Sequence, residues 1–264
     1  MQIKLQHKSS EIGTQRGGYM QVSVIMPVYN GARYIKQAID SVLMQEVDVE
    51  VLVVDDQSTD NLPEVMAEYE NDERVRWIQN EVNLGVAKSR NHGVTLAKGE
   101  YIAFLDADDW WAPGKLKAQL SMMEAQGAVL SGTARELMSP AGESTGRMIP
   151  VKERITLKEL LTHNSISCSS VVVKRDVMLK YPMTHDDSHE DYITWIQILK
   201  EHDWALGIDE PYLKYRLSEG SKSRNKFKSA WMTYKVYRYS GYGVFTSLRH
   251  WITYAYNGFK KYYM

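Results

Sequence analysis

One stretch constrains the fold more than any other: an apolar run that ends abruptly in three carboxylates. Residues 101–111 read YIAFLDADDWW, so Asp106, Asp108 and Asp109 follow directly on aliphatic and aromatic residues. A buried parallel strand has this pattern when it delivers acidic groups to the carboxyl edge of a sheet, where open α/β folds bind ligands. Two carboxylates one residue apart suit a hard divalent cation, and such a cation suits a diphosphate. A strand followed by a plain acidic turn fits the same letters.

The first hundred residues alternate between strand and helix patterns. Apolar, β-rich runs of strand length occur at 22–27, 49–54, 75–78 and 101–105. Between the first two runs, apolar residues recur at helical spacing at Ile35, Ala38, Ile39, Val42 and Leu43. A further helix is expected at 86–97, after the turn at 83–85 and before the stop at 98–99. This alternation predicts an α/β protein whose mostly parallel, Rossmann-like sheet is flanked by helices and joined by right-handed crossovers. Because the second strand ends in Asp55 and Asp56, both acidic clusters should lie along the same edge of the sheet.

The second half is less regular. A helix should begin at Pro113, short strands are expected at 128–131, 134–138 and 171–173, and the acid- and histidine-rich loop 185–191 leads into another helix. The predicted division is a mobile leader at 1–20, a catalytic domain at 21–225 with a nucleotide-binding half (21–109) and an acceptor half (110–225), and a helical tail at 226–264.

Composition excludes several classes of protein. Hydrophobic residues make up 44% and charged residues 25% of the chain, and the formal net charge is −1, so it reads as a soluble globular protein without affinity for nucleic acid. Its single cysteine, Cys168, rules out an internal disulfide and favours a reducing compartment. No apolar run approaches the ~20 residues of a membrane-spanning helix. Residues 1–20 lack the apolar core of a signal peptide.

Five short motifs occur in order. They are 27–30 (PVYN), 53–60 (VVDDQSTD), 83–91 (NLGVAKSRN), 104–109 (FLDADD) and 190–192 (EDY). With these motifs the chain resembles the family 2 inverting glycosyltransferases of GT-A fold, from about residue 22 to residue 216. Within that family the resemblance is to bacterial enzymes that build surface polysaccharides such as O-antigen, capsule or teichuronic acid.

The resemblance implies a donor site in the first half. Pro27 and Tyr29 would line the uracil pocket, Asp56 would bond the edge of the uracil ring, and Asp55 would support that turn. Arg90 would reach the nucleotide. Each carboxylate also fits the simpler interpretation of a turn former, and Arg90 fits that of a charged residue decorating a helix.

The resemblance also implies the metal site and the base. Asp106 would contact the ribose or the metal, and Asp108 would bind a divalent ion, Mn²⁺ or Mg²⁺, that bridges the donor diphosphate. Asp191 would be the general base that takes the proton of the acceptor hydroxyl. Two acids in the first turn of a helix, stabilised by its dipole, are the competing interpretation of Glu190 and Asp191.

Two other pairs of residues allow two interpretations each. His185 and His189 lie among carboxylates and could ligate a metal, but solvated loop residues are favoured because one such cation needs only one or two protein carboxylates. Trp110 and Trp111 fit either the core or the wall of an acceptor site.

The chain departs from the family pattern at three places. Ile193 stands where many members have an acidic residue two positions after the base. Many members have a histidine directly after a Tyr-Arg pair, whereas here Leu217 and Ser218 follow Tyr215 and Arg216. Lys222 and Arg224 could supply the positive charge that such a histidine brings to the diphosphate. The membrane helices and the Gln-x-x-Arg-Trp motif of the processive synthases are absent, which implies transfer of one sugar per encounter.

These observations predict an inverting transferase that moves a sugar from a UDP-sugar to a glycan acceptor, such as one linked to polyprenyl diphosphate. A nucleotidyltransferase on a related α/β sheet is the first alternative, although residues 28–31 lack the Gly-rich, lysine-bearing loop of that class. An inactive sugar-binding module is the second alternative.

The tail mixes bases with aromatic residues. From Lys222 to Lys261 it contains bases and no acid. Aromatic rings favour the headgroup region of a bilayer and bases favour anionic lipids, so the tail should hold a cytoplasmic enzyme on the inner face of the cell membrane. Packing of the same helices on the catalytic domain, or on a second subunit in a homodimer, is the alternative.

Overall fold

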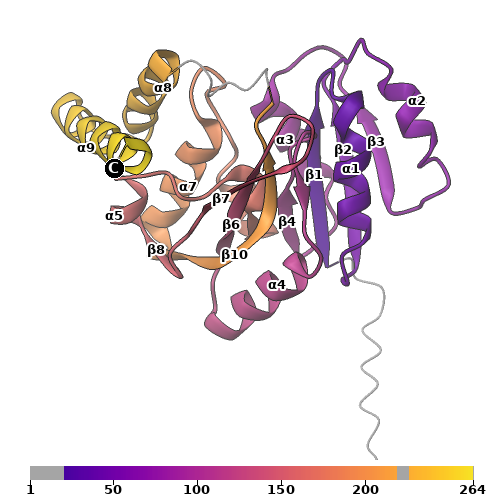
Figure 1. Cartoon of the computed structure of the whole chain (residues 1–264), viewed down its shortest axis with the longest axis horizontal. Helices are drawn as coiled ribbons and strands as arrows, with labels where there is room; N and C mark the ends of the chain where they lie inside the picture. The colour runs from indigo at the N-terminus through magenta and orange to yellow at the C-terminus, as the bar shows by residue number, and fades with distance from the viewer. Residues whose placement is uncertain (1–20, 219–225, 264) are drawn as a thin grey trace, which may run out of the picture.

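The computed structural model describes residues 21–218 and 226–263 and organises them around one ten-stranded sheet (Figure 1). The strand order is β3-β2-β1-β4-β9-β6-β10-β5, with β7 beside β6 and β8 beside β10. The leader expected at 1–20 lies outside the described residues, as do Lys222 and Arg224.

The first half forms the parallel part of the sheet. Its strands are β1 (Val22–Val28), β2 (Val49–Asp55), β3 (Val75–Gln79) and β4 (Tyr101–Phe104), and its helices are α1 (Ala32–Leu43), α2 (Leu62–Ala67) and α3 (Val86–Leu96). β1 pairs in parallel with β2 on one side and β4 on the other, and β2 pairs in parallel with β3. The predicted parallel sheet is therefore confirmed, and the carboxyl ends of β1, β2 and β4 lie along one edge.

The second half extends the same sheet. Its strands are β5 (Trp110–Trp111), β6 (Leu130–Met138), β7 (Ser144–Ile149), β8 (Arg154–Thr156), β9 (Val172–Lys174) and β10 (Trp204–Arg216), and its helices are α4 (Lys115–Gln126), α5 (Leu157–Leu160), α6 (Arg175–Lys180) and α7 (Glu190–Glu201). β9 runs antiparallel to both β4 and β6, whereas β6 and β10 are parallel. The prediction of two strands at 128–131 and 134–138 is wrong. Gly132 and Thr133 pair with Gly207 and Ile208, so β6 continues through them.

Two hydrophobic cores cover the two faces of the sheet. The alternation of side chains along β1 divides them: Ile25 packs into the core that includes α3 and α7, whereas Val24 and Met26 pack into the core that includes α1 and α4. All three side chains are fully buried. Burial on both faces explains why the strand sequences are continuously apolar instead of alternating.

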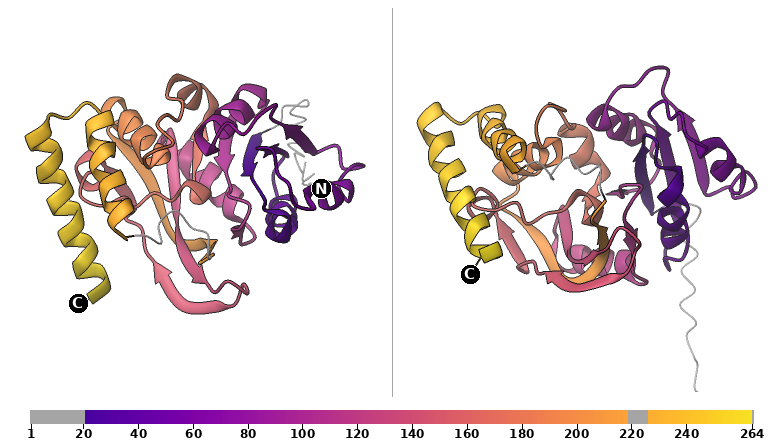
Figure 2. Two further views of the ribbon diagram at one scale, coloured as in Figure 1. Left: turned by 90° about the horizontal axis from the view of Figure 1, so that it is seen from above. Right: turned by 45° about the horizontal axis from the view of Figure 1, so that its top comes forward.

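The predicted helical tail is confirmed as two helices, α8 (Lys226–Tyr239) and α9 (Val244–Tyr263). They lie at the end of the molecule opposite α2 and β3 (Figures 1 and 2). α8 packs against α7 and buries Val236 and Tyr237 completely, and α9 packs against α8. Among the described residues, no helix is both long enough and apolar enough to span a bilayer.

Candidate active site

The loop after β2 is held by the Asp55 carboxylate. Its Oδ1 accepts a hydrogen bond from Ser58 N at 2.8 Å, and its Oδ2 accepts one from Gln79 Nε2 at 3.2 Å. The loop after β1 is tied to the same place, because Asp56 N donates to Val28 O at 2.8 Å. Pro27 is buried at the end of β1, and Tyr29, which follows it, is 56% exposed. This edge of the sheet therefore presents an aromatic ring above a tightly bonded turn.

Asp56 organises a third loop. Its carboxylate accepts hydrogen bonds from Leu84 N at 2.7 Å, from Gly85 N at 2.9 Å and from Asn80 Nδ2 at 2.8 Å. Its side chain is 5% exposed in total. A carboxylate offers about four acceptor positions. Three are used here, so the contact of Asp56 with a uracil ring stays a prediction that relies on the remaining one.

Backbone strain gathers at this edge. In the described part of the chain, the non-glycine residues with positive φ are Asn30, Gln57 and His185, at 53°, 68° and 67°. They lie in the loops after β1 and β2 and before α7. Asn30 is held in place by its Oδ1, which accepts from Thr59 N at 2.8 Å. Such conformations cost free energy and cluster at functional sites, which agrees with a ligand site built from these loops.

Arg90 bridges the two halves of the site. Its Nη2 lies 2.6 Å from Asp106 Oδ1, and its Nη1 lies 2.8 Å from Glu190 Oε1. The Arg90 side chain is 4% exposed, and although burial lowers its pKa, the charges of Asp106 and Glu190 raise it overall. The interpretation of Arg90 as a helix decoration is therefore wrong. Direct contact with a nucleotide stays a prediction, since both terminal nitrogens already join the acidic motif after β4 to the helix that carries Asp191.

Arg216 organises the other acidic residues. Its Nε donates to Asp108 O at 2.8 Å, its Nη2 donates to Gln37 Oε1 at 2.6 Å, and its backbone N donates to Asp109 Oδ1 at 2.9 Å. Ser218 Oγ, two residues on, donates to Asp108 Oδ2 at 2.7 Å. The end of β10 thus clamps the turn that carries the acids.

Burial and like charge raise the pKa of two carboxyls in this turn. The pKa of Asp108 is raised first by burial and then by the charge of Asp106, and that of Asp109 is raised by burial and by both neighbours. Carboxylates that disfavour one another's ionisation are stabilised by a cation placed between them. The turn therefore has the electrostatics of a cation site.

The carboxylate oxygens of this turn suit a cation that takes most of its ligands from a bound substrate and not from the protein. Among the described residues, no cluster of three or more His, Cys, Asp or Glu side chains could enclose a metal ion. Within the same part of the chain, hydrogen bonds reach Oδ1 of Asp106 and Oδ2 of Asp108, which leaves one oxygen of each carboxylate. Mg²⁺ and similar hard ions are often held by one or two carboxylates together with substrate phosphates. The pair fits such an ion.

Asp191 stands in the first turn of α7, beside Glu190. Burial first and the charge of Glu190 second raise the pKa of Asp191 to about 6, against the lowering effect of Arg90. Its Oδ1 accepts from Tyr192 N at 2.8 Å, and its side chain remains partly exposed. A partly exposed carboxylate with a pKa near neutrality has the properties of a general base.

The loop before α7 is fixed by α8 and α3. Asp187 Oδ2 lies 2.6 Å from Lys235 Nζ and accepts from Tyr239 Oη at 3.0 Å, and His185 stacks on the Tyr239 ring at 3.7 Å between centroids. Asp186 Oδ1 accepts from Ala87 N at 2.8 Å, in the first turn of α3. His185 is thus an aromatic contact to α8, which agrees with the interpretation that it is not a metal ligand.

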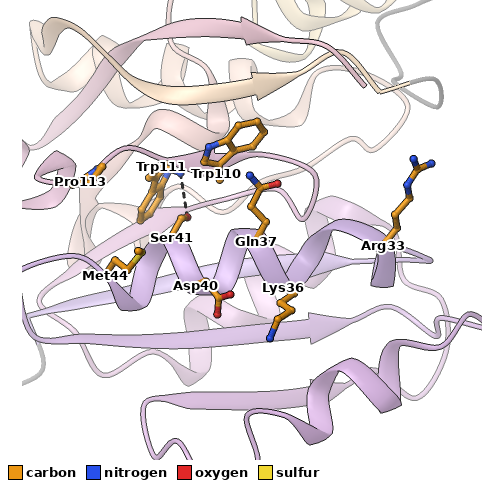
Figure 3. Close-up of a pocket in the computed structure, with 9 residues that line it drawn as sticks. All are labelled: Arg33, Lys36, Gln37, Asp40, Ser41, Met44, Trp110, Trp111 and Pro113. Atoms are coloured by element: carbon orange, nitrogen blue, oxygen red, sulfur yellow. Dashed lines mark hydrogen bonds between the residues drawn. The ribbon is translucent and has the colours of Figure 1, made fainter. Parts of the chain in front are cut away.

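Trp110 and Trp111 lie in different environments. Trp111 is 2% exposed and its Nε1 donates to Ser169 O at 2.7 Å, so it belongs to the core. Trp110 is partly exposed, with the Arg216 guanidinium 4.7 Å from its ring. It borders a groove of about 560 Å³ between α1 and the segment that leads into α4 (Figure 3). The groove is lined by Arg33, Lys36, Gln37, Asp40, Ser41, Met44, Trp110, Trp111 and Pro113. Trp110 is thus available to a ligand.

Several residues that build the candidate site have no role assigned by the sequence pattern. Arg216 stands in a Tyr-Arg pair and Glu190 in the first turn of a helix, and neither pattern indicates what the side chain contacts. Ser218 stands where the family often has a histidine, and it donates to Asp108. Asp186 was one acid among several in its loop. A buried arginine that pairs with a residue about 100 positions away, as Arg90 does with Glu190 and Arg216 with Asp108, leaves no local signal in the sequence.

The family model for glycosyl transferase family 2 matches residues 23–179. The chain is a family 2 glycosyltransferase. The match covers more than half of the chain and contains the acidic motif after β4 as well as Arg90. It decides the class of enzyme against the nucleotidyltransferase alternative.

Curated relatives of this family 2 glycosyltransferase include bacterial enzymes of similar length. TuaG of Bacillus subtilis (strain 168), whose name assigns it to teichuronic acid biosynthesis, is 37% identical over 82% of the chain and 87% of its own length. WfgD of Escherichia coli, named as a UDP-Glc:alpha-D-GlcNAc-diphosphoundecaprenol beta-1,3-glucosyltransferase, is 37% identical over 78% of the chain and 81% of its own length.

Solved structures show that the fold is GT-A. S. aureus TarS 1-349 in complex with UDP-GlcNAc matches with a TM-score of 0.69 at 19% identity, over 93% of this chain and 76% of that one. The mannosyltransferase PcManGT of Pyrobaculum calidifontis, in complex with GDP-Man and Mn2+, matches with a TM-score of 0.67 at 17% identity, over 92% and 76%. The predicted fold class is confirmed.

Proposed function

We propose that this glycosyltransferase moves one sugar from a UDP-sugar to a hydroxyl group of a glycan acceptor, with inversion at the anomeric carbon. One observation carries the proposal: Arg90 joins the acidic turn after β4 to the first turn of α7, where Asp191 has a pKa of about 6. A cation-binding carboxylate pair and a base on neighbouring elements are what transfer from a nucleoside diphosphate requires.

The reaction is a single displacement. Asp191 accepts the proton of the acceptor hydroxyl while that oxygen attacks the anomeric carbon, and the bond from this carbon to the diphosphate breaks with its electron pair leaving on UDP. The reacting carbon has oxocarbenium character at the transition state. Attack from the face opposite the leaving group inverts the centre and needs no covalent intermediate.

Asp108 and Asp106 are the residues that would hold a divalent ion, Mn²⁺ or Mg²⁺. When bound, the ion neutralises negative charge that develops on the departing diphosphate. PcManGT, with the same fold, was solved with Mn2+. Arg216 and Ser218 contribute by fixing Asp108, and Arg90 by fixing Asp106. These contacts preorganise the carboxylates before the donor arrives.

A UDP-sugar is the donor class that the relatives favour. WfgD is named for UDP-Glc, and TarS was solved with UDP and with UDP-GlcNAc. Pro27, Tyr29 and Asp56 lie where β1 and β2 end, and we assign them to the uracil, with Asp55 supporting the turn. The exposed Tyr29 ring offers a stacking surface for the base.

The acceptor is a lipid-linked glycan in bacterial surface polysaccharide synthesis. WfgD is named for an acceptor on diphosphoundecaprenol, and TuaG for teichuronic acid biosynthesis. In this proposal the enzyme works on the cytoplasmic face of the membrane. Residues 21–225 are the catalytic domain in this proposal, divided near Asp109 into nucleotide and acceptor halves.

The experiment is a transfer assay with a panel of UDP- and GDP-sugars and synthetic polyprenyl-diphosphate acceptors. We expect UDP as the released nucleotide and a product of inverted anomeric configuration by NMR. In Asp191→Asn, donor binding should survive and transfer should fall by roughly 10²–10⁴, because the amide cannot accept the proton. A product of retained configuration, or an Asn variant as fast as the parent, contradicts the proposal. Turnover with any donor excludes an inactive sugar-binding module.

A further inference from the structure

α9 carries an exposed apolar stripe along one side. Its members follow helical spacing, so they lie on one face. They are Val244, Phe245, Leu248, Ile252 and Tyr256, with exposed fractions of 54, 88, 43, 55 and 62%. Contiguous exposed apolar surface of this kind marks an interaction site on a soluble protein.

The opposite face of α9 supplies its attachment to the fold. Trp251 Nε1 donates to Ala230 O at 2.6 Å, and Asn257 Nδ2 donates to Thr162 O at 3.2 Å. Ser247 is fully buried, and its Oγ donates to Tyr242 O at 3.3 Å. The helix is therefore held from its inner side, and folding of the chain does not require the outer stripe. α9 is also the outermost element at its end of the molecule (Figure 2).

The charge of the surrounding sequence favours an anionic lipid surface over a second copy of the chain as the partner of this face. Residues 220–264 contain no Asp or Glu, and their bases are Lys222, Arg224, Lys226, Lys228, Lys235, Arg238, Arg249, Lys260 and Lys261. Arg249 is exposed and follows Leu248 at the side of the stripe. In a symmetric dimer across this face, each copy would bring Arg249 against a helix whose sequence holds bases and no acid to pair with it. An anionic lipid surface, by contrast, attracts those bases and accepts the apolar side chains.

We propose that the outer face of α9 docks on an anionic bilayer, with Phe245 and Ile252 inserted at the level of the headgroups. This inference rests on the proposed function, because a lipid-linked acceptor gives docking its purpose. The same helix pair contacts the loop that leads into α7, the helix that carries Asp191, because Lys235 and Tyr239 of α8 hold Asp187. Docking through α9 therefore sets the position of Asp191 relative to the membrane surface.

The experiment uses the full chain and vesicles of phosphatidylcholine with or without one quarter phosphatidylglycerol, sedimented at low and high salt without donor or acceptor. The variant is Phe245→Ser with Ile252→Ser. Both side chains are exposed, so the free energy of unfolding of the variant should equal that of the parent. The matched control is Met148→Ser with Leu179→Ser, whose parent side chains are 62% and 48% exposed on β7 and α6.

We expect the parent and the control to sediment with anionic vesicles at low salt and to be released at high salt. The variant should partition at least roughly tenfold less, since two large apolar side chains no longer leave water. Equal sedimentation of variant and parent overturns the inference, as does a parent that stays in the supernatant. A parent that is dimeric by light scattering, and a variant that is monomeric, would assign the face to a second copy and also overturn it.

The outcome is separable from that of the transfer assay. Vesicle binding without transfer of any sugar would support the docking surface and contradict the proposed reaction. Transfer to a water-soluble acceptor analogue without vesicle binding does the reverse.

Discussion

The raised pKa of Asp191 has two causes that mutation can separate. Burial is the larger, and the charge of Glu190 is the second. Glu190→Gln removes that charge and keeps an oxygen that can accept from Arg90 Nη1, which now lies 2.8 Å from the carboxylate. Arg90 then has one fewer anion to balance, so more of its charge acts on Asp191. Both changes lower the pKa of Asp191, and the sign of the shift is therefore fixed.

The size of the shift follows from the geometry. Consecutive side chains on a helix diverge, so the loss of one like charge should lower the pKa by about 1 unit, near the small end of shifts caused by close charges. In the proposed reaction Asp191 acts as a base in its ionised form, so activity should be lost as the pH falls through its pKa. With the parent pKa at about 6, roughly one tenth of the enzyme is ionised at pH 5, whereas about half would be ionised in the variant. Relative to its own plateau, the variant should be about fivefold more active at pH 5.

The assay is kcat/KM for the acceptor from pH 4.5 to 8.5, since its acid limb reports the base of the free enzyme. The plateau of Glu190→Gln should drop modestly, because a weaker base takes the proton less readily. Glu124→Gln, an exposed change on α4, is the control and should leave the limb in place. A limb that stays fixed or moves to higher pH in Glu190→Gln would refute the reasoning, and so would an unchanged limb in Asp191→Asn.

Three further predictions concern the proposed cation site at Asp106 and Asp108 and the loops. Asp108→Ala should abolish turnover and weaken UDP binding in the presence of Mn²⁺ without lowering the melting temperature, and full activity in excess chelator would contradict it. Arg216→Lys keeps the charge but loses the planar fork that fixes Asp108, so the Mn²⁺ concentration for half-maximal activity should rise roughly 10- to 100-fold. Gly85→Ala should cost about 1–3 kcal/mol in urea unfolding, because φ is +87° and the new Cβ would lie 2.7 Å from Asp186 Oδ2. Gly146→Ala, at φ +70° with open space around it, isolates the backbone part of that cost.

The parallel half of the fold could be predicted because its information is local. Each strand there is a continuous apolar run, and each run ends in turn residues or acids, as at Asp55 and Asp106. Parallel pairing brings those ends to one edge without further assumption. The pattern fails where tertiary pairing overrides it, as in β6, whose residues Gly132 and Thr133 suggested a break but pair with β10.

For the candidate site, the sequence indicates a set of residues but not the network among them. Motifs single out Asp106, Asp108 and Asp191, whose roles stay predictions, and the structure adds the contacts that join or fix them. Arg90 reaches Glu190 across 100 positions, and Arg216 reaches Asp108 across 108. Contacts of that separation depend on the packing of α3, α7 and β10. The pKa of Asp191 depends on the same packing, and its sequence neighbours alone do not set it.

The antiparallel strand β9 has a mechanical consequence. Val172 and Val173 pair with β4 on one side and with β6 on the other, and both are fully buried. The two halves of the enzyme therefore share an unbroken ladder of hydrogen bonds, and a hinge between them would have to break it. Closure around substrates must then come from the loops at the carboxyl edge. We expect amide exchange in β9 to be as slow as in β1 and unaffected by donor, while protection changes appear at 83–86 and 185–189.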